Sequence, residues 1–172
     1  MKLSLIILLA FSLSMDAFSL SLAYGTLDFS ETKKRRLALS VGVFHFVMPI
    51  LGMAVKHYLE LLFHMSLDIV TFVLFVYIGI TMLKDSKDDS NMAIDMGIKD
   101  ILLFSLAVSI DSFTAGIGIP TFTLIAPLLF SICSALFTYL GLYLGSKLHQ
   151  AFGRVATVCG GAIFILLAFV YI

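Results

Sequence analysis

Two aspartates stand alone in the middle of long apolar stretches, and their surroundings are alike. Asp16 lies in "FSLSMDAFSLSLAYG" (residues 11–25) and Asp111 in "LAVSIDSFTAGIGIP" (residues 106–120). Each has a serine two positions before it, a phenylalanine two positions after it and a hydroxyl residue three positions after it. An ionised aspartate at the centre of a membrane helix costs about 2.5–3.5 kcal/mol on insertion scales. Two of them in matching motifs therefore predict a functional pair.

The side chains expected near this pair suit a hard divalent cation. Ser19 and Thr114 carry hydroxyl groups one helical turn after the two aspartates. His45 lies at the centre of another apolar stretch, and Pro49, which has no N–H, leaves the carbonyl oxygen of His45 without its helical donor. Oxygen donors with at most one imidazole favour Mn²⁺, Fe²⁺ or Mg²⁺ over Cu⁺. The predicted metal ligands are Asp16, Asp111, His45, Ser19 and Thr114.

Two neighbouring carboxylates also predict proton exchange. Together they balance the charge of a divalent cation, and in the empty site at least one of them binds a proton, because two close carboxylates do not both stay ionised. Metal and proton then compete for one site, which predicts a cation/proton exchanger. The stretch "GLYLGSK" (residues 141–147) lacks the spacing of a phosphate-binding loop. Intramembrane proteolysis also uses two aspartates, but the short mirrored motifs with hydroxyl groups one turn on are more typical of ion handling. We therefore expect no enzymatic activity and no cofactor, the metal being the transported substrate.

The distribution of charge predicts the elements that hold these residues. The chain has 172 residues and is 60% hydrophobic and 13% charged, so most side chains suit hydrocarbon rather than water. Its 11 Lys and Arg and 11 Asp and Glu residues fall in five short windows, except Asp16 and Asp111. Between the windows run apolar segments of about the 20 residues that a helix needs to cross a bilayer. The predicted crossings are residues 3–24, 37–55, 69–83, 101–119, 122–145 and 155–172.

The matching motifs predict an internal repeat. We expect a first three-helix repeat at residues 1–83, a cytoplasmic linker at 84–99 and a second three-helix repeat at 100–172. An odd number of crossings in each repeat gives the two repeats opposite orientations. The predicted fold is an all-α integral membrane protein of six transmembrane helices, arranged as two inverted repeats with the site at their interface.

Lysine and arginine counts predict the orientation in the membrane. The loops at residues 25–36, 84–99 and 146–153, with Arg154 beside the last, hold nine of these residues, and the opposite side holds only Lys2 and Lys56. The positive-inside rule therefore places these loops in the cytoplasm and both termini outside. The larger basic cluster follows the first apolar run, which excludes a cleaved signal peptide.

The remaining composition favours packing roles. A formal net charge of zero predicts no nucleic-acid partner. Cys133 and Cys159 lie inside predicted crossings without disulfide spacing, so we expect them to be packing residues. Gly141 and Gly145 are spaced four apart, which predicts a face where another helix packs closely.

These motifs together resemble the MntP family of bacterial manganese efflux pumps, within the LysE-type transporter superfamily. The likeness runs over nearly the whole chain and includes S-M-D-A-F-S, M-P-I-L-G (residues 48–52), S-I-D-S-F-T-A-G-I-G and G-G-A-I (residues 160–163). It implies export of Mn²⁺ across the cell membrane, with the family's essential aspartates at Asp16 and Asp111. Two positions depart from the family pattern: Ala23 replaces the usual glycine, and His45 stands where Gln or Glu is common.

Other functions fit parts of this pattern. An exporter of Fe²⁺, Cd²⁺ or an amino acid belongs to the same class, although no Lys or Arg lies in mid-span to bind a substrate carboxylate. A non-transporting membrane scaffold or assembly protein belongs to a different class. That function predicts that Asp16→Asn is tolerated.

Overall fold

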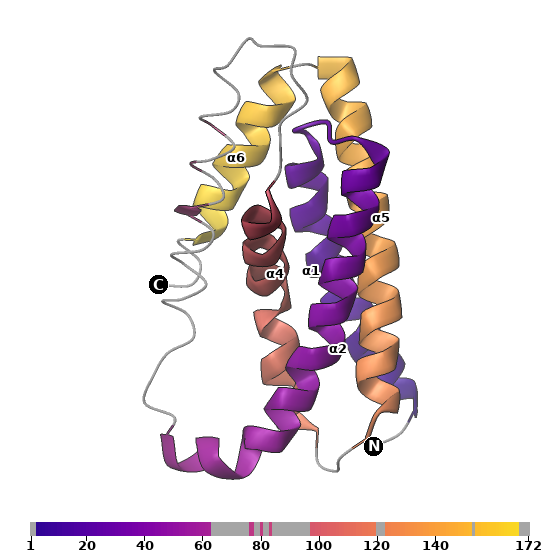
Figure 1. Cartoon of the computed structure of the whole chain (residues 1–172), viewed down its shortest axis with the longest axis vertical. Coiled ribbons are helices and arrows are strands. Elements are labelled where there is room, and N and C mark those ends of the chain that lie inside the picture. Colours follow the sequence, from indigo (N-terminus) through magenta and orange to yellow (C-terminus); the bar gives the residue numbers. More distant parts are fainter. Residues whose placement is uncertain are drawn as a thin grey trace.

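The computed structural model describes residues 3–62, 76–77, 80, 83, 97–119, 123–152 and 154–168. Five helices account for almost all of them (Figure 1). They are α1 (Leu3–Gly25), α2 (Glu31–Leu62), α4 (Ile98–Gly118), α5 (Ile125–Phe152) and α6 (Arg154–Ala168). The described residues contain no strand.

Four helices are long and apolar enough to cross a membrane, namely α1, α2 over Glu31–Val55, α4 and α5. They coincide with the first, second, fourth and fifth predicted crossings. α6 lies at the sixth predicted crossing and is described over 15 residues. Most of the third predicted crossing (69–83) and residues 84–96 of the predicted linker (84–99) lie outside the described residues.

The helices extend beyond the apolar segments that predicted them. α2 begins at Glu31 and continues to Leu62, whereas the hydropathy pattern bounded its crossing at 37–55. α5 continues to Phe152, so residues 146–152 are helical and the predicted loop at 146–153 is wrong there. Both extensions contain Lys, Arg, Glu or Gln, which are good helix formers in water as well as in lipid. Hydropathy marks where lipid begins, not where a helix ends.

α1 and α5 form one closely packed parallel pair. A Cβ atom at Gly141 would lie 2.6 Å from the carbonyl oxygen of Phe18, and one at Gly145 would lie 2.9 Å from the Cα of Gly25. Only glycine permits so close a backbone approach. The predicted close-packing role of Gly141 and Gly145 is therefore confirmed.

α2 and α4 form a second parallel pair. The Ser105 hydroxyl donates a 2.8 Å hydrogen bond to the Ser40 hydroxyl, and a Cβ atom at Gly116 would lie 2.6 Å from the Cα of Pro49. The contacts advance along both helices in the same direction. α2 also packs on α5, where a Cβ atom at Gly42 would lie 3.0 Å from that of Ala135. α6 packs against α1 and α5 (Figure 1).

A short loop, residues 26–30, turns the chain from α1 into α2. Leu27 and Phe29 of this loop are buried, and Asp28 adopts a positive φ of 53°. The Asp28 carboxylate accepts a hydrogen bond from the Ser146 hydroxyl of α5. The loop therefore packs against the end of the helix bundle. Cys133 and Cys159 are both free thiols, as the sequence predicts.

Candidate metal site

Asp16 and Asp111 lie on two helices that contact each other, α1 and α4. Asp16 is exposed and Asp111 is half-buried. The structure therefore places the two predicted aspartates on one pair of contacting helices.

Both aspartates also lie at a similar depth. α1 is antiparallel to α2, and α2 is parallel to α4, so α1 and α4 run in opposite directions. The rings of Tyr24 on α1 and Phe104 on α4 stack with their centroids 4.5 Å apart. Asp16 precedes Tyr24 by eight residues and Asp111 follows Phe104 by seven, so at 1.5 Å per residue they lie roughly 12 and 10 Å from the stack.

The serine and the aspartate of each motif face different sides of their helix, because two residues in a helix are separated by about 200°. The Ser14 hydroxyl donates a 2.6 Å hydrogen bond to the Ala10 carbonyl and lies 3.4 Å from the Ser134 hydroxyl of α5. The buried Ser109 hydroxyl donates to the Ser105 carbonyl at 2.5 Å. The motif serines therefore belong to the packed faces, and the aspartates project from other faces of α1 and α4.

The two hydroxyl residues predicted as ligands are both exposed. Ser19 donates a 2.9 Å hydrogen bond to the Met15 carbonyl, which leaves its oxygen lone pairs free to accept or to bind a cation. Thr114 lies one turn beyond Asp111 on α4. Ser19 and Thr114 thus remain on the accessible side of their helices.

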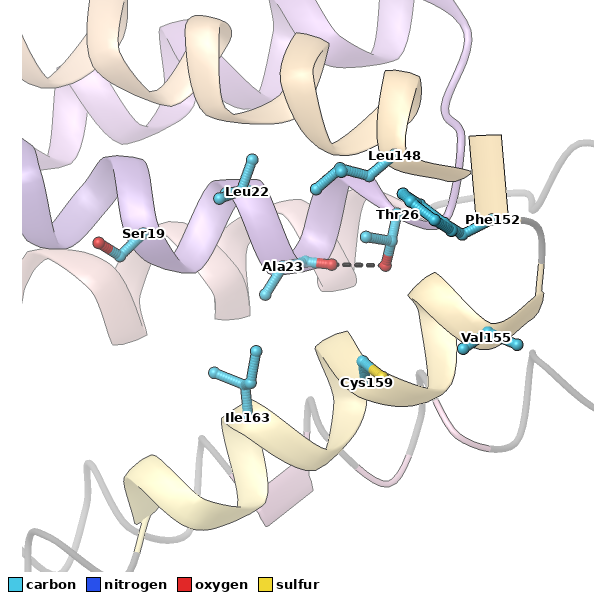
Figure 2. Close-up of a pocket in the computed structure, with 9 residues that line it drawn as sticks. All are labelled: Ser19, Leu22, Ala23, Thr26, Leu148, Phe152, Val155, Cys159 and Ile163. Carbon is cyan, nitrogen blue, oxygen red and sulfur yellow. Dashed lines mark hydrogen bonds between the residues drawn. The ribbon is translucent and has the colours of Figure 1, made fainter. Parts of the chain in front are cut away.

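Ser19 also lines a cavity of about 270 Å³ between α1, α5 and α6 (Figure 2). Apolar side chains form most of its wall, including Leu22, Phe152 and Ile163. The Thr26 hydroxyl in this wall donates to the Ala23 carbonyl at 2.6 Å (Figure 2). A divalent cation needs several oxygen or nitrogen ligands, so this apolar cavity is not suited to hold one.

His45 is completely buried on α2. Its Nδ1 lies 3.0 Å from the Val41 carbonyl oxygen. Since a carbonyl oxygen only accepts, Nδ1 carries the hydrogen, and the neutral ring presents a lone pair at Nε2. Nε2 is buried and has no hydrogen-bond partner among the residues that the structure describes. Gly42 and Pro49, on the same face of α2, contact α5 and α4 respectively, so His45 lies between those helices.

The five predicted ligands do not form one cluster. Within the described part of the chain, no group of three or more His, Cys, Asp or Glu side chains is placed to hold a metal ion. The aspartates lie on the contacting helices α1 and α4, with Ser19 and Thr114 one turn away, whereas His45 is buried on α2. Sequence reasoning did not single out the Tyr24–Phe104 stack, whose residues look like any others in an apolar run.

Comparison with known proteins defines the family. Residues 28–172 match the family described as "Mntp: Putative manganese efflux pump". Relatives named "Putative manganese efflux pump MntP" include one from Geobacillus kaustophilus, 34% identical over 94% of this chain and 90% of its own length. Others come from Methanobrevibacter smithii (32%, covering 94% and 92%) and Methanosphaera stadtmanae (32%, covering 95% of both). No solved structure matches the chain significantly.

The chain belongs to the MntP family. This confirms the resemblance inferred from the paired motifs. The MntP family is one of metal efflux transporters and not of enzymes. Together with four helices able to span a bilayer, membership makes this chain a multi-pass membrane protein.

Proposed function

We propose that the chain exports Mn²⁺ across the cell membrane in exchange for protons, and that Asp16 and Asp111 bind the metal. The observation that carries this proposal is the pair of mid-span aspartates on contacting, oppositely directed helices of an MntP-family chain. A carboxylate in mid-span is costly unless it serves an ion. Here Asp16 is exposed and Asp111 is half-buried, so neither carboxylate is enclosed in the packed core of the described helices.

Proton exchange follows from the charge of this pair. Bound Mn²⁺ is neutralised by two carboxylates, whereas the empty pair is relieved of repulsion when it takes up a proton. Release of metal on one side of the membrane is then coupled to protonation of the carboxylates. We propose Ser19 and Thr114 as further oxygen ligands, and His45 as a ligand only if α2 and α4 move relative to each other.

The proposed inverted repeat is supported by two matched sets of contacts. A Cβ atom at Gly141 would meet the Phe18 carbonyl oxygen and the backbone nitrogen of Leu22, which are two and six residues after Asp16. A Cβ atom at Gly52 would meet the Phe113 carbonyl oxygen and the backbone nitrogen of Ile117, which are two and six residues after Asp111. The contact of α1 with α5 thus resembles the contact of α4 with α2. In each of the proposed repeats, residues 1–83 and 100–172, the first helix packs on the second helix of the other repeat.

Manganese content in a host that lacks its own exporter tests the function. Expression of the chain should lower cellular Mn and restore growth at high Mn²⁺. Asp16→Asn and Asp111→Asn keep the size of the side chain but remove its charge, and each should abolish both effects. Asp100→Asn is the matched control, because Asp100 lies in the first turn of α4, where its carboxylate accepts a hydrogen bond from the backbone N–H of Gly97.

The outcomes separate the alternatives. Full export by both Asn variants would rule out the aspartate pair as the metal site. Unchanged Mn with altered Fe or Cd would assign another cation. No change in any metal, with or without the substitutions, would favour a membrane protein that does not transport.

A further inference from the structure

Three aromatic rings meet at the end of the bundle that carries the loop between α1 and α2. Tyr24 stacks on Phe104 with an interplanar angle of 16°, and the Phe29 ring lies 5.2 Å from that of Tyr24. Their exposed fractions are 5%, 0% and 3% for Tyr24, Phe104 and Phe29. The three rings come from α1, α4 and the loop, so they join these elements in one buried contact.

This aromatic cluster lies directly beyond the aspartates along the same helix faces. On α1, Leu20 and Tyr24 follow Asp16 at intervals of four residues, which keeps them on one face. On α4, Phe104 precedes Asp111 by seven residues, again on one face. Leu20 is buried, and so is Ala107, midway between Phe104 and Asp111. About two turns of closely packed apolar side chains therefore separate the aspartates from the loop end.

The same faces are open in the opposite direction. Ser12 and Leu8, which precede Asp16 by four and eight residues, are exposed. Thr114 and Gly118, which follow Asp111 by three and seven residues, are also exposed, and a Cβ atom at Gly118 would meet no atom of the described residues within 4 Å. Within the described residues, the shared α1–α4 face is thus packed on the loop side of the aspartates and exposed on the other side, while the cavity beside Ser19 lies on a different face of α1.

The loop is fixed in a way that holds Phe29 against the stack. Asp28, its neighbour, accepts a hydrogen bond from Ser146 of α5. At the start of α2, Glu31 accepts one from the Tyr139 hydroxyl of α5 at 3.0 Å and one from Lys34 at 3.0 Å. These bonds tie both ends of the Phe29 segment to α5 or α2.

We propose that Tyr24, Phe104 and Phe29 form a gate that closes the passage between the aspartate pair and the loop end of the bundle. A hydrated cation does not enter packed aromatic side chains, because none of them replaces its water ligands. Entry from the loop side requires the Tyr24–Phe104 stack to separate. The assignment of Mn²⁺ as the gated ion rests on the proposed function. In the predicted orientation the gate lies on the cytoplasmic side.

A buried cysteine placed behind the rings reports whether the gate is closed. We would introduce Ala107→Cys in a chain carrying Cys133→Ser and Cys159→Ser, reconstituted in vesicles, and add a charged, membrane-impermeant methanethiosulfonate reagent to the loop side. Labelling should be slow with the rings intact. Phe104→Leu, which removes the stacked ring but keeps an apolar side chain, should speed it by about tenfold, equivalent to 1.4 kcal/mol of easier opening.

A matched control separates gating from general loosening. Phe137 of α5 makes edge contacts with Phe11 and Phe18, whose ring centroids lie 5.4 and 6.3 Å away, outside the gate. In the Phe137→Leu chain, the labelling rate of the Ala107→Cys reporter should stay within about twofold of the rate with all rings intact, because the contacts of Phe137 do not cover α4. A second reporter, Ala10→Cys, sits in a separate buried cluster and should stay protected in the Phe104→Leu chain.

The outcomes are distinct. Unchanged labelling at Ala107→Cys in the Phe104→Leu chain, confirmed with Tyr24→Leu, would overturn the gate. Equal acceleration at the Ala10→Cys reporter would also overturn it, because the effect would then be global. The labelling needs no Mn²⁺, so failure of the Asp→Asn export test would leave this result standing and would refute only the assignment of the ion.

Discussion

His45 shows how the chemistry of a single residue follows from its hydrogen bonds. The Val41 carbonyl oxygen fixes the hydrogen on Nδ1, and the lone pair of Nε2 is buried without a hydrogen-bond donor among the described residues. An unsatisfied buried acceptor costs about 1–3 kcal/mol, so a histidine used only for packing would be a poor choice at this position. The sequence could identify His45 as unusual, but it could not show that its ring is fully buried and hydrogen-bonded to the Val41 carbonyl.

Replacement of His45 separates an ion-handling role from a packing role. His45→Met removes the unsatisfied nitrogen and leaves no new polar group without a partner, so the folded protein should be as stable or about 1 kcal/mol more stable. If His45 contacts the ion during transport, Mn²⁺ export by this variant should fall about tenfold. Thermal unfolding in detergent and Mn²⁺ flux into vesicles measure the two effects on the same preparation.

His45→Gln serves as the comparison, because its amide keeps an oxygen able to bind a cation. It should retain most of the export activity. Normal export by His45→Met would assign the histidine to the packed core alone.

At the scale of helices, small residues decide which elements pair. Glycines let α5 approach α1, and α4 approach α2, to backbone contact. The sequence predicted the close-packing face at Gly141 and Gly145 because glycines four apart recur at such interfaces. It could not predict that α1 would be the partner, since several apolar helices offer similar faces and lipid is no less apolar than they are. It also could not mark Tyr24 and Phe104 as a pair, because their contact joins residues 80 positions apart.

Gly141→Ala should therefore destabilise the fold. The added methyl group would lie 2.6 Å from the Phe18 carbonyl oxygen, and α1 or α5 must shift to accept it. Such overpacking costs about 1–3 kcal/mol, which exceeds the helix propensity that alanine adds. Gly118→Ala is the control, because no atom in the described part of the chain lies within 4 Å of its Cβ position. Equal thermal unfolding of the two variants in detergent would contradict the tight contact.

The arrangement of the whole molecule was predictable from charge more than from any motif. The windows of charged residues located α1, α2, α4 and α5, since lipid excludes charge along a whole crossing. They misjudged the ends of α2 and α5, because charged residues at the membrane surface still continue a helix. The paired aspartate motifs were sufficient to indicate the MntP family. They could not indicate that helices from opposite halves pair with each other, because that pairing depends on contacts between distant small residues.

Cysteines at the two ends of the bundle test the predicted orientation. Ser30 is exposed in the loop between α1 and α2. Leu124 precedes α5 at the opposite end of the bundle and is 55% exposed. Each position is replaced by cysteine. In a chain otherwise free of cysteine, an impermeant maleimide should label Ser30→Cys only from the cytoplasm and Leu124→Cys only from outside. The reverse pattern would invert the proposed direction of the gate.

The pairing of α1 with α5 has a consequence for how the protein is made. Ser14 and Ser134 meet across 120 residues of sequence, so α1 enters the membrane long before its main partner has been synthesised. Until then its small-residue face, with Ser14 and Gly25, is covered only by lipid or by transient neighbours. A ribosome stalled before α5 would leave a nascent chain inserted in the bilayer but lacking its native assembly. Biogenesis of this exporter is therefore completed late, when the second half arrives.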